Sequence, residues 1–201
     1  MEISKELIKK LRDRTGAGFM DCKEALKECG GDLEKAVDYL REKGLARLQK
    51  RSSRAALEGI IASYIHTGGK IGSMVEINCE TDFVANTKEF HEFAKDIAMQ
   101  IAATNPLYIR REDVDEATKE REKNIYKRQA LEIGKPESIA EKIAEGKLEK
   151  FYSEVCLLEQ PFIKNPDVTV KDLLKEMALK LGENIVIRRF ARFQLGELEE
   201  S

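Results

Sequence analysis

The side chains best suited to catalysis or to metal binding are few in this sequence. They are two histidines and four cysteines: His66, His91, Cys22, Cys29, Cys79 and Cys156. No two cysteines form a C-x-x-C pair, and neither histidine stands at a metal-ligand spacing from a second candidate ligand. All four cysteines occupy apolar or semi-apolar positions of periodic segments. We therefore expect reduced, buried thiols rather than disulfides or a zinc site.

The sequence also lacks the common motifs of catalytic and nucleotide-binding sites. It has no G-x-x-x-x-G-K-[ST] loop, no G-x-G-x-x-G after a predicted strand, no H-E-x-x-H and no G-x-S-x-G. The Gly-Gly pairs at 30–31 and 68–69 are explained by helix capping and by a turn. A catalytic triad would need one of the two histidines, and His91 lies in a predicted helix beside Phe90 and Phe93. We predict no enzyme active site and no cofactor, and an unrecognised enzyme stays open as an alternative.

One segment could act by contact rather than by catalysis. Residues 80–87, with the sequence ETDFVANT, connect a predicted strand to a predicted helix. An acid beside a large aromatic at such a junction, here Asp82 beside Phe83, could form a protruding tip. Composition alone favours another role for Phe83, as a core residue or a hydrophobic staple.

The composition limits the classes of partner. The 201 residues carry 35 Lys+Arg and 37 Asp+Glu, a net charge of -2, and 42% hydrophobic residues, which excludes a fully disordered chain. A dedicated nucleic-acid binder would normally show a strong basic excess. No apolar stretch approaches the roughly 18 residues of a membrane span, and the N-terminus resembles neither a secretory signal nor a transit peptide. We expect a cytoplasmic protein with no membrane partner.

The first part of the chain reads as three short amphipathic helices. Ser4 can cap the first, Gly30 and Gly31 can end the second, and Asp32 can cap the third. Residues 41–54 then hold six basic side chains and one acid, which favours a solvated linker helix over a nucleic-acid contact. We predict a domain boundary at Ser52-Ser53, with one domain over 1–54 and a core domain over 55–201.

In the second part of the chain the spacing of apolar residues changes, and the new pattern predicts an α+β domain. Alternating segments at 57–66, 71–79 and 184–195 predict three strands, the first two joined by a hairpin turn at 67–70. A slip in apolar parity around Arg188-Arg189 suggests a bulge. The segments between 90 and 182 have helical periodicity. These patterns predict a small antiparallel three-stranded sheet covered by helices on one face.

Two motifs reveal a family resemblance. They are LRDRTGAGFMDCKEAL at 11–26 and NCETDFVAN at 78–86, and three further stretches match in the same order: PLYIRREDV (106–114), EGKLEKFYSEVCLLEQPF (145–162) and LGENIVIRRF (181–190). Through them the sequence resembles the translation elongation factor Ts family over nearly its whole length.

The resemblance implies a guanine-nucleotide exchange factor for the GTPase elongation factor Tu, acting without covalent catalysis in a bacterial-type cytoplasm. The N-terminal helices would form a ubiquitin-associated-like module that docks on the GTPase through Met20 and Lys23. The family's wedge, which disturbs the Mg²⁺ site of the GTPase, maps onto Thr81, Asp82, Phe83 and Val84. The resemblance therefore reverses the expectation for Phe83, which becomes an exposed anchor.

The chain holds one copy of the core half that longer family members repeat. It resembles the short form, in which two chains pair through their sheets, so we expect a homodimer with the 184–195 strand as a candidate edge. His66 is a further possible contact by similarity to the second half of the longer forms, although a surface histidine explains it equally well. An RNA- or ribosome-binding module that uses residues 41–54 remains the second alternative, whereas the resemblance implies no direct nucleic-acid partner.

Overall fold

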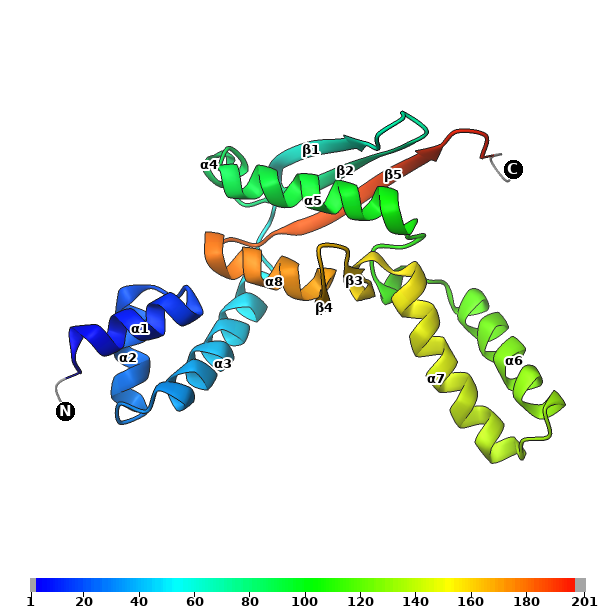
Figure 1. Ribbon diagram of the computed structural model, residues 1–201, viewed down its shortest axis with the longest axis horizontal. Coiled ribbons are helices and arrows are strands. Elements are labelled where there is room, and N and C mark those ends of the chain that lie inside the picture. Colours follow the sequence, from blue (N-terminus) through cyan, green and yellow to red (C-terminus); the bar gives the residue numbers. More distant parts are fainter. Residues whose placement is uncertain (1–2, 198–201) are drawn as a thin grey trace.

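The structure is a computed structural model that describes residues 3–197 (Figure 1). The extreme ends of the two predicted domains, residues 1–2 and 198–201, lie outside this range. The described chain has helices at the N-terminus, then a small sheet with helices on one side, and a helical arm that extends away from the sheet (Figure 1).

The three N-terminal helices are α1 (Lys5–Thr15), α2 (Phe19–Glu28) and α3 (Leu33–Arg51). The predicted caps are in place, because the side chain of Ser4 accepts the N–H of Leu7 and that of Asp32 accepts two N–H groups of α3. A small core lies between the helices, formed by Ile8, Leu11, Cys22, Ala25, Leu26 and Ala36.

Helix α3 differs from the prediction in its length. It has 19 residues and contains most of the basic stretch up to Arg51, so the short third helix and the predicted linker helix are one continuous helix. The helix contains no proline that would interrupt it. Its one glycine, Gly44, lies where α3 packs on α8 (Val170–Leu181), and a Cβ at this position would lie 3.3 Å from a methyl carbon of Leu179. The helix therefore continues until Ser52 and Ser53.

The predicted sheet is confirmed. Strands β1 (Glu58–Ile65), β2 (Ile71–Cys79) and β5 (Val186–Gln194) pair antiparallel in the order β1-β2-β5. The register shifts between the Glu76–Arg189 and Ile77–Ile187 pairs, which leaves Arg188 unpaired as the predicted bulge.

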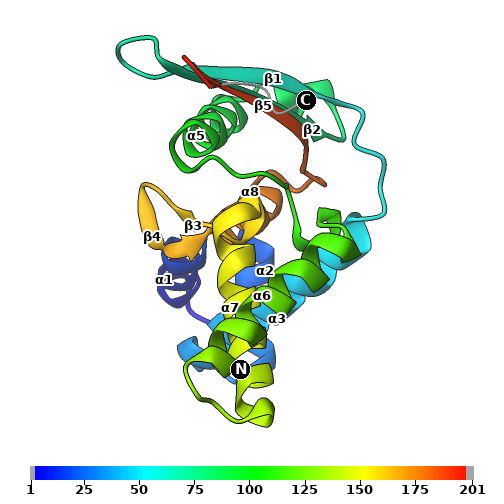
Figure 2. The ribbon, with the colours of Figure 1, turned by 90° about the vertical axis from the view of Figure 1, so that its right-hand side faces the viewer.

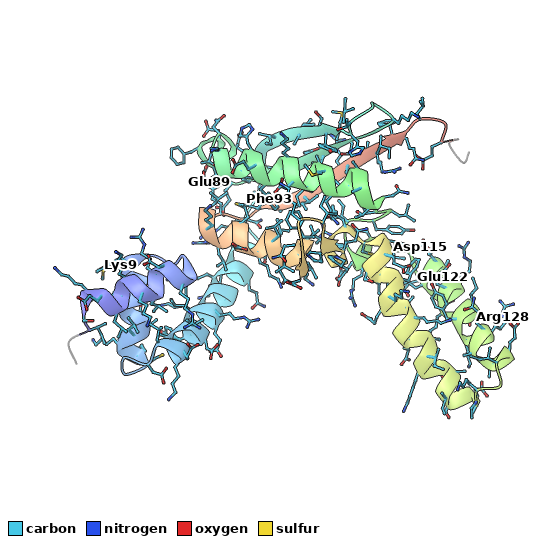
Figure 3. The ribbon with its side chains drawn as sticks, viewed as in Figure 1. Lys9, Glu89, Phe93, Asp115, Glu122 and Arg128 are labelled. Atoms are coloured by element: carbon cyan, nitrogen blue, oxygen red, sulfur yellow. The ribbon has the colours of Figure 1, made fainter. Side chains whose placement is uncertain are left out.

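Helix α5 (Lys88–Thr104) packs under one face of the sheet, and α8 lies beyond it (Figures 1 and 2). Phe93 projects from the side of α5 that faces α8 (Figure 3). The main core lies between the sheet, α5 and α8. It includes Val75, Ile77, Phe90, Ile97, Ile101, Val170, Ile185 and Ile187. No described element covers the other face of the sheet (Figures 1 and 2).

The arm consists of α6 (Glu116–Glu132) and α7 (Glu137–Val155), both of which the sequence predicts. Asp115 begins α6 at the base of the arm, and Arg128 lies near its far end (Figure 3). Two 3₁₀ turns, η1 (Arg111–Asp113) and η2 (Leu157–Glu159), connect the arm to the core. The short ribbon β3 (Pro161–Phe162) and β4 (Asn165–Thr169) was not predicted, because two prolines and a two-residue strand give no periodic signal.

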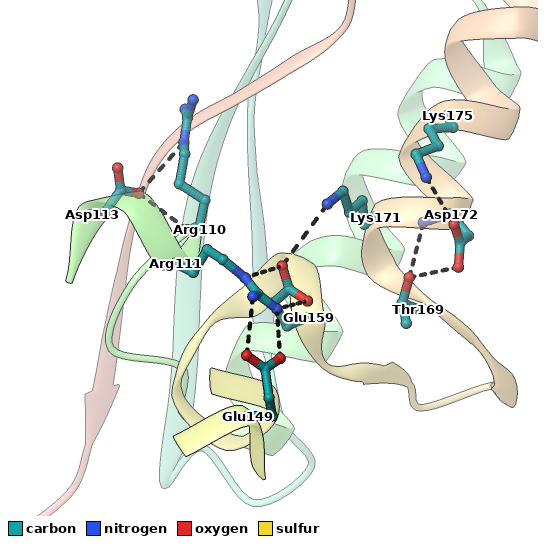
Figure 4. A network of polar contacts seen from close by, with 9 residues as sticks. All are labelled: Arg110, Arg111, Asp113, Glu149, Glu159, Thr169, Lys171, Asp172 and Lys175. Atoms are coloured by element: carbon teal, nitrogen blue, oxygen red, sulfur yellow. Dashed lines mark hydrogen bonds and ion pairs between the residues drawn. The ribbon is translucent and has the colours of Figure 1, made fainter. Parts of the chain in front are cut away.

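Arg111 holds the base of the arm in place (Figure 4). Its guanidinium donates to Glu159 at 3.0 and 3.2 Å and to Glu149 at 3.2 and 3.4 Å, and lies 4.9 Å from the ring centre of Tyr152. Lys171 of α8 also approaches Glu159, at 3.9 Å. These charges lower the pKa of Glu159, with Arg111 as the main cause. The network therefore connects α7, η1, η2 and α8.

Candidate functional site

The 80–87 segment forms a short protruding turn at one end of the sheet. β2 ends at Cys79, and the single-turn helix α4 (Asp82–Ala85) follows directly. Thr81 caps α4, with its hydroxyl oxygen accepting the N–H of Val84 at 3.4 Å. Thr87 then caps α5, so the segment is fixed at both ends by side-chain caps.

The four residues assigned to the wedge have different environments. The side chain of Phe83 is 80% exposed, and Asp82 is exposed beside it. Val84 is 5% exposed and belongs to the main core, where it anchors α4 on the sheet. Thr81 is also exposed, but its hydroxyl is hydrogen-bonded to Glu183 and to the N–H of Val84. Thr81 and Val84 therefore hold the turn in shape, while the side chains of Asp82 and Phe83 project from it.

Glu183 supports the base of this turn, a role that sequence reasoning missed. Its carboxylate accepts the N–H groups of Glu80 and Thr81 at 3.0 and 3.1 Å and the Thr81 hydroxyl at 2.6 Å. Glu80 in turn accepts the N–H of Asn184 at 2.7 Å. Glu80 lies in the motif at 78–86 and Glu183 in the motif at 181–190, which is the signal that could have indicated this contact.

Cys79 lies at the same junction and is buried. Its thiol donates to the carbonyl of Thr81 at 3.2 Å, and burial raises the pKa of Cys79 to about 11. The thiol is therefore protonated and unreactive at neutral pH. All four cysteines are free thiols, as expected, and three of them are buried; Cys29 is only half-buried, so the expectation of burial is wrong for that residue.

The second predicted contact surface lies on α2, in the N-terminal helices. Met20 is 69% exposed, and Lys23, three residues later, is exposed next to it on the same side of the helix. Phe19, which precedes Met20, is 46% exposed. The structure thus places Met20 and Lys23 together, on a different element from Phe83 (Figure 1).

His66 lies apart from the other candidates. It follows β1 at the hairpin turn, with its Nδ1 atom 3.1 Å from the hydroxyl oxygen of Tyr64. The turn is at the opposite end of β1 from the strand pair Glu58–Cys79, roughly 25 Å away along an eight-residue strand. The fold therefore does not bring His66 to the turn that carries Phe83.

Half of the basic residues in the 41–54 stretch are paired within the protein. Lys43 contacts Glu24 at 2.7 Å, Arg47 makes a two-pronged contact with Asp21 at 2.7 and 3.1 Å, and Arg54 contacts Glu80 at 3.3 Å. Each pair reduces the positive charge that would face a phosphate backbone. This arrangement favours the structural interpretation of the stretch over nucleic-acid binding.

Residues 3–197 offer neither a metal site nor a membrane-spanning helix. No cluster of three or more His, Cys, Asp or Glu side chains is placed to hold a metal ion in that range. No helix of the described part combines the length and hydropathy needed to cross a membrane.

Comparison with known proteins gives a consistent result. The family described as "Elongation factor TS" matches residues 20–197. The elongation factor Ts of Carboxydothermus hydrogenoformans is 63% identical over 195 residues, which is 97% of this chain and 90% of that relative. Those of Thermoanaerobacter sp. and Desulfosudis oleivorans are 62% and 60% identical over 195 residues, covering 96% and 98% of the relatives. The chain belongs to the elongation factor Ts family.

Proposed function

We propose that the protein is a guanine-nucleotide exchange factor for elongation factor Tu, acting in the cytoplasm during translation elongation. The observation that carries this proposal is the turn at 80–87, which presents Phe83 to solvent on a base fixed by hydrogen bonds. A large aromatic side chain that is exposed and rigidly mounted is typical of an interface anchor.

The mechanism needs no covalent step. A P-loop GTPase holds GDP through backbone N–H groups, a lysine and a Mg²⁺ ion. Because Mg²⁺ demands near-ideal octahedral geometry, a small displacement of the groups around it weakens nucleotide binding. Phe83 would enter an apolar slot of the GTPase, and Asp82 would make polar contacts beside it. The coupling is reciprocal, so GTP binding favours release of the factor.

Met20 and Lys23 would supply a separate contact on the nucleotide domain of the GTPase. An exposed methionine adapts its shape to a partner surface, and the neighbouring ammonium group adds a polar contact. Two surfaces on different elements, each of moderate size, would raise affinity without a large continuous interface.

A homodimer through the sheet completes the proposal. The uncovered face of the sheet carries exposed apolar side chains on three strands, namely Ile61, Ile65, Met74 and Phe193. An apolar sheet face of this kind is typical of an interface. In a twofold dimer the same surface of both chains meets, so a second copy would cover these side chains with the same apolar residues.

The test is stopped-flow release of fluorescent GDP from elongation factor Tu. We expect the wild-type chain to accelerate release strongly and the double variant Asp82→Ala, Phe83→Ala to lose most of that effect while keeping its fold. Ile133→Ala, which removes an exposed apolar side chain at the far end of the arm, is the matched control. This variant should accelerate GDP release from elongation factor Tu as strongly as the wild type does. Failure of the wild type to accelerate release would refute the exchange function.

A further inference from the structure

Three distant segments of the chain meet at the base of the 80–87 turn. They are Ser52–Arg54 after α3, Glu80–Thr81 before α4, and Glu183–Asn184 between α8 and β5. Glu183 is half-buried at the centre of this junction. None of these contacts belongs to the regular hydrogen bonding of a helix or a sheet.

The carboxylate of Glu183 controls how α4 begins. One of its oxygens accepts the N–H groups of Glu80 and Thr81, which fixes the backbone as it leaves β2. The other accepts the Thr81 hydroxyl at 2.6 Å. Because the hydrogen of that hydroxyl is directed at Glu183, its lone pairs remain free to accept the N–H of Val84, the bond that caps α4.

Glu80 closes the junction from the other side. Its carboxylate accepts the N–H of Asn184 at 2.7 Å and contacts Arg54 at 3.3 Å, and the Asn184 amide donates to the carbonyl of Arg54 at 2.9 Å. The pKa of Glu80 is lowered, first by the Asn184 N–H and also by Arg54. Glu80 is therefore charged at neutral pH, and hydrogen-bond donors occupy the oxygens of both carboxylates.

We infer that Glu183 is a positioning residue for nucleotide exchange, holding α4 so that Phe83 enters the partner in one fixed direction. This inference rests on the exchange function proposed above. At 80% exposure the Phe83 ring has too few neighbours to set its own direction, so the start of α4 sets it. A preorganised anchor avoids the entropic cost of ordering the turn on binding.

The first experiment measures the maximum rate of GDP release at saturating factor. We expect Glu183→Ala to lower this rate about tenfold, since a displacement of roughly 1 Å at a reacting contact can cost up to a hundredfold. Glu183→Gln should restore most of the rate, because its amide oxygen can accept the two N–H groups and its NH₂ can donate to Thr81. Glu183→Asp is too short to reach both partners and should resemble Glu183→Ala, which gives a second variant if the alanine protein does not fold.

The second experiment separates positioning from general stability. In a Phe83→Ala background, Glu183→Ala should cause no further loss of rate, because no ring remains to be positioned. Glu159→Ala removes another carboxylate with several partners in the same domain, far from the turn, and should leave the release rate unchanged. The inference would be overturned if Glu183→Ala lowered the rate of GDP release equally with and without the Phe83 ring. It would also be overturned if Glu183→Ala accelerated release as well as an active wild type does. An inactive wild type would instead refute the exchange function.

Discussion

Phe83 and Val84 are consecutive residues that α4 places in opposite environments: Phe83 is 80% exposed, whereas Val84 is 5% exposed and belongs to the main core. One turn of helix is sufficient for this, because successive side chains point about 100° apart. Phe83, the proposed contact residue, is thus adjacent to Val84, which fixes α4 to the core. Substitution of each residue by itself should therefore distinguish binding from stability.

Val84→Ala should destabilise the protein by about 2 kcal/mol, because it removes buried methyl groups and leaves a small cavity. Phe83→Ala should change stability by less than about 0.5 kcal/mol, because the ring is largely exposed. Urea unfolding followed by circular dichroism gives both values. A loss of more than about 1.5 kcal/mol for Phe83→Ala would show that the ring packs on the core and does not serve as a free anchor.

Gly59 is required by the pairing of β1 with β2. It has φ = 144°, and an added Cβ would lie 2.1 Å from the carbonyl oxygen of Ile77. We expect Gly59→Ala to cost about 3 kcal/mol or more, since a strained backbone and a steric clash combine. Gly72→Ala is the control in the same hairpin, because its Cβ would approach neighbouring atoms only to 3.5 Å. Similar urea midpoints for the two variants would contradict this account.

The Arg111 network should make stability depend on acid pH. Because the pKa of Glu159 is lowered in the folded state, mainly by Arg111, the unfolded state binds more protons as pH falls. The stabilisation is present above the ordinary glutamate pKa of about 4.3 and is lost as pH falls through the lowered folded-state value. Urea midpoints of the wild type and Glu159→Gln should differ at pH 6 and converge toward pH 3. A difference that stays constant over this range would exclude Glu159 as the cause.

Phe193→Asp should prevent dimer formation if the sheet faces form the interface. It places a charge on the uncovered face near Ile65 and Gly72, where desolvating it opposes association. Sedimentation velocity at micromolar concentration should give a dimer for the wild type and a monomer for the variant. Ile133→Asp, an equally drastic change at the far end of the arm, should remain dimeric. A monomeric wild type would refute the dimer proposal.

Much of the fold could be predicted from local signals. Strand β2 was predicted with its observed bounds because Ile71, Ser73, Val75, Ile77 and Cys79 alternate along it. The starts of two helices were predicted from the side-chain caps Ser4 and Asp32. The bulge at Arg188 followed from a slip in apolar parity. These features are encoded within a few residues of where they appear.

The parts that were missed depend on contacts between distant residues. The support that Glu183 gives to Thr81 spans 102 positions, and no periodicity in either segment indicates it. For Phe83, composition alone favours a core residue or a hydrophobic staple, which is wrong for a residue that is 80% exposed. The expectation of an exposed ring came from the family resemblance. Single residues at junctions were therefore the least predictable part of the candidate site.

The pairing of β2 with β5 has a consequence for the newly made chain. Glu76 and Arg189 form an ion pair across these strands at 2.7 Å although they lie 113 residues apart. At about 5 to 20 residues per second, a ribosome needs roughly 6 to 23 s between the two. During most of that interval β1 and β2 can pair and pack on α5, but β5 is missing from the sheet and Glu183 has not yet been made. A protein proposed to serve translation would thus acquire a correctly oriented Phe83 only near the end of its own synthesis.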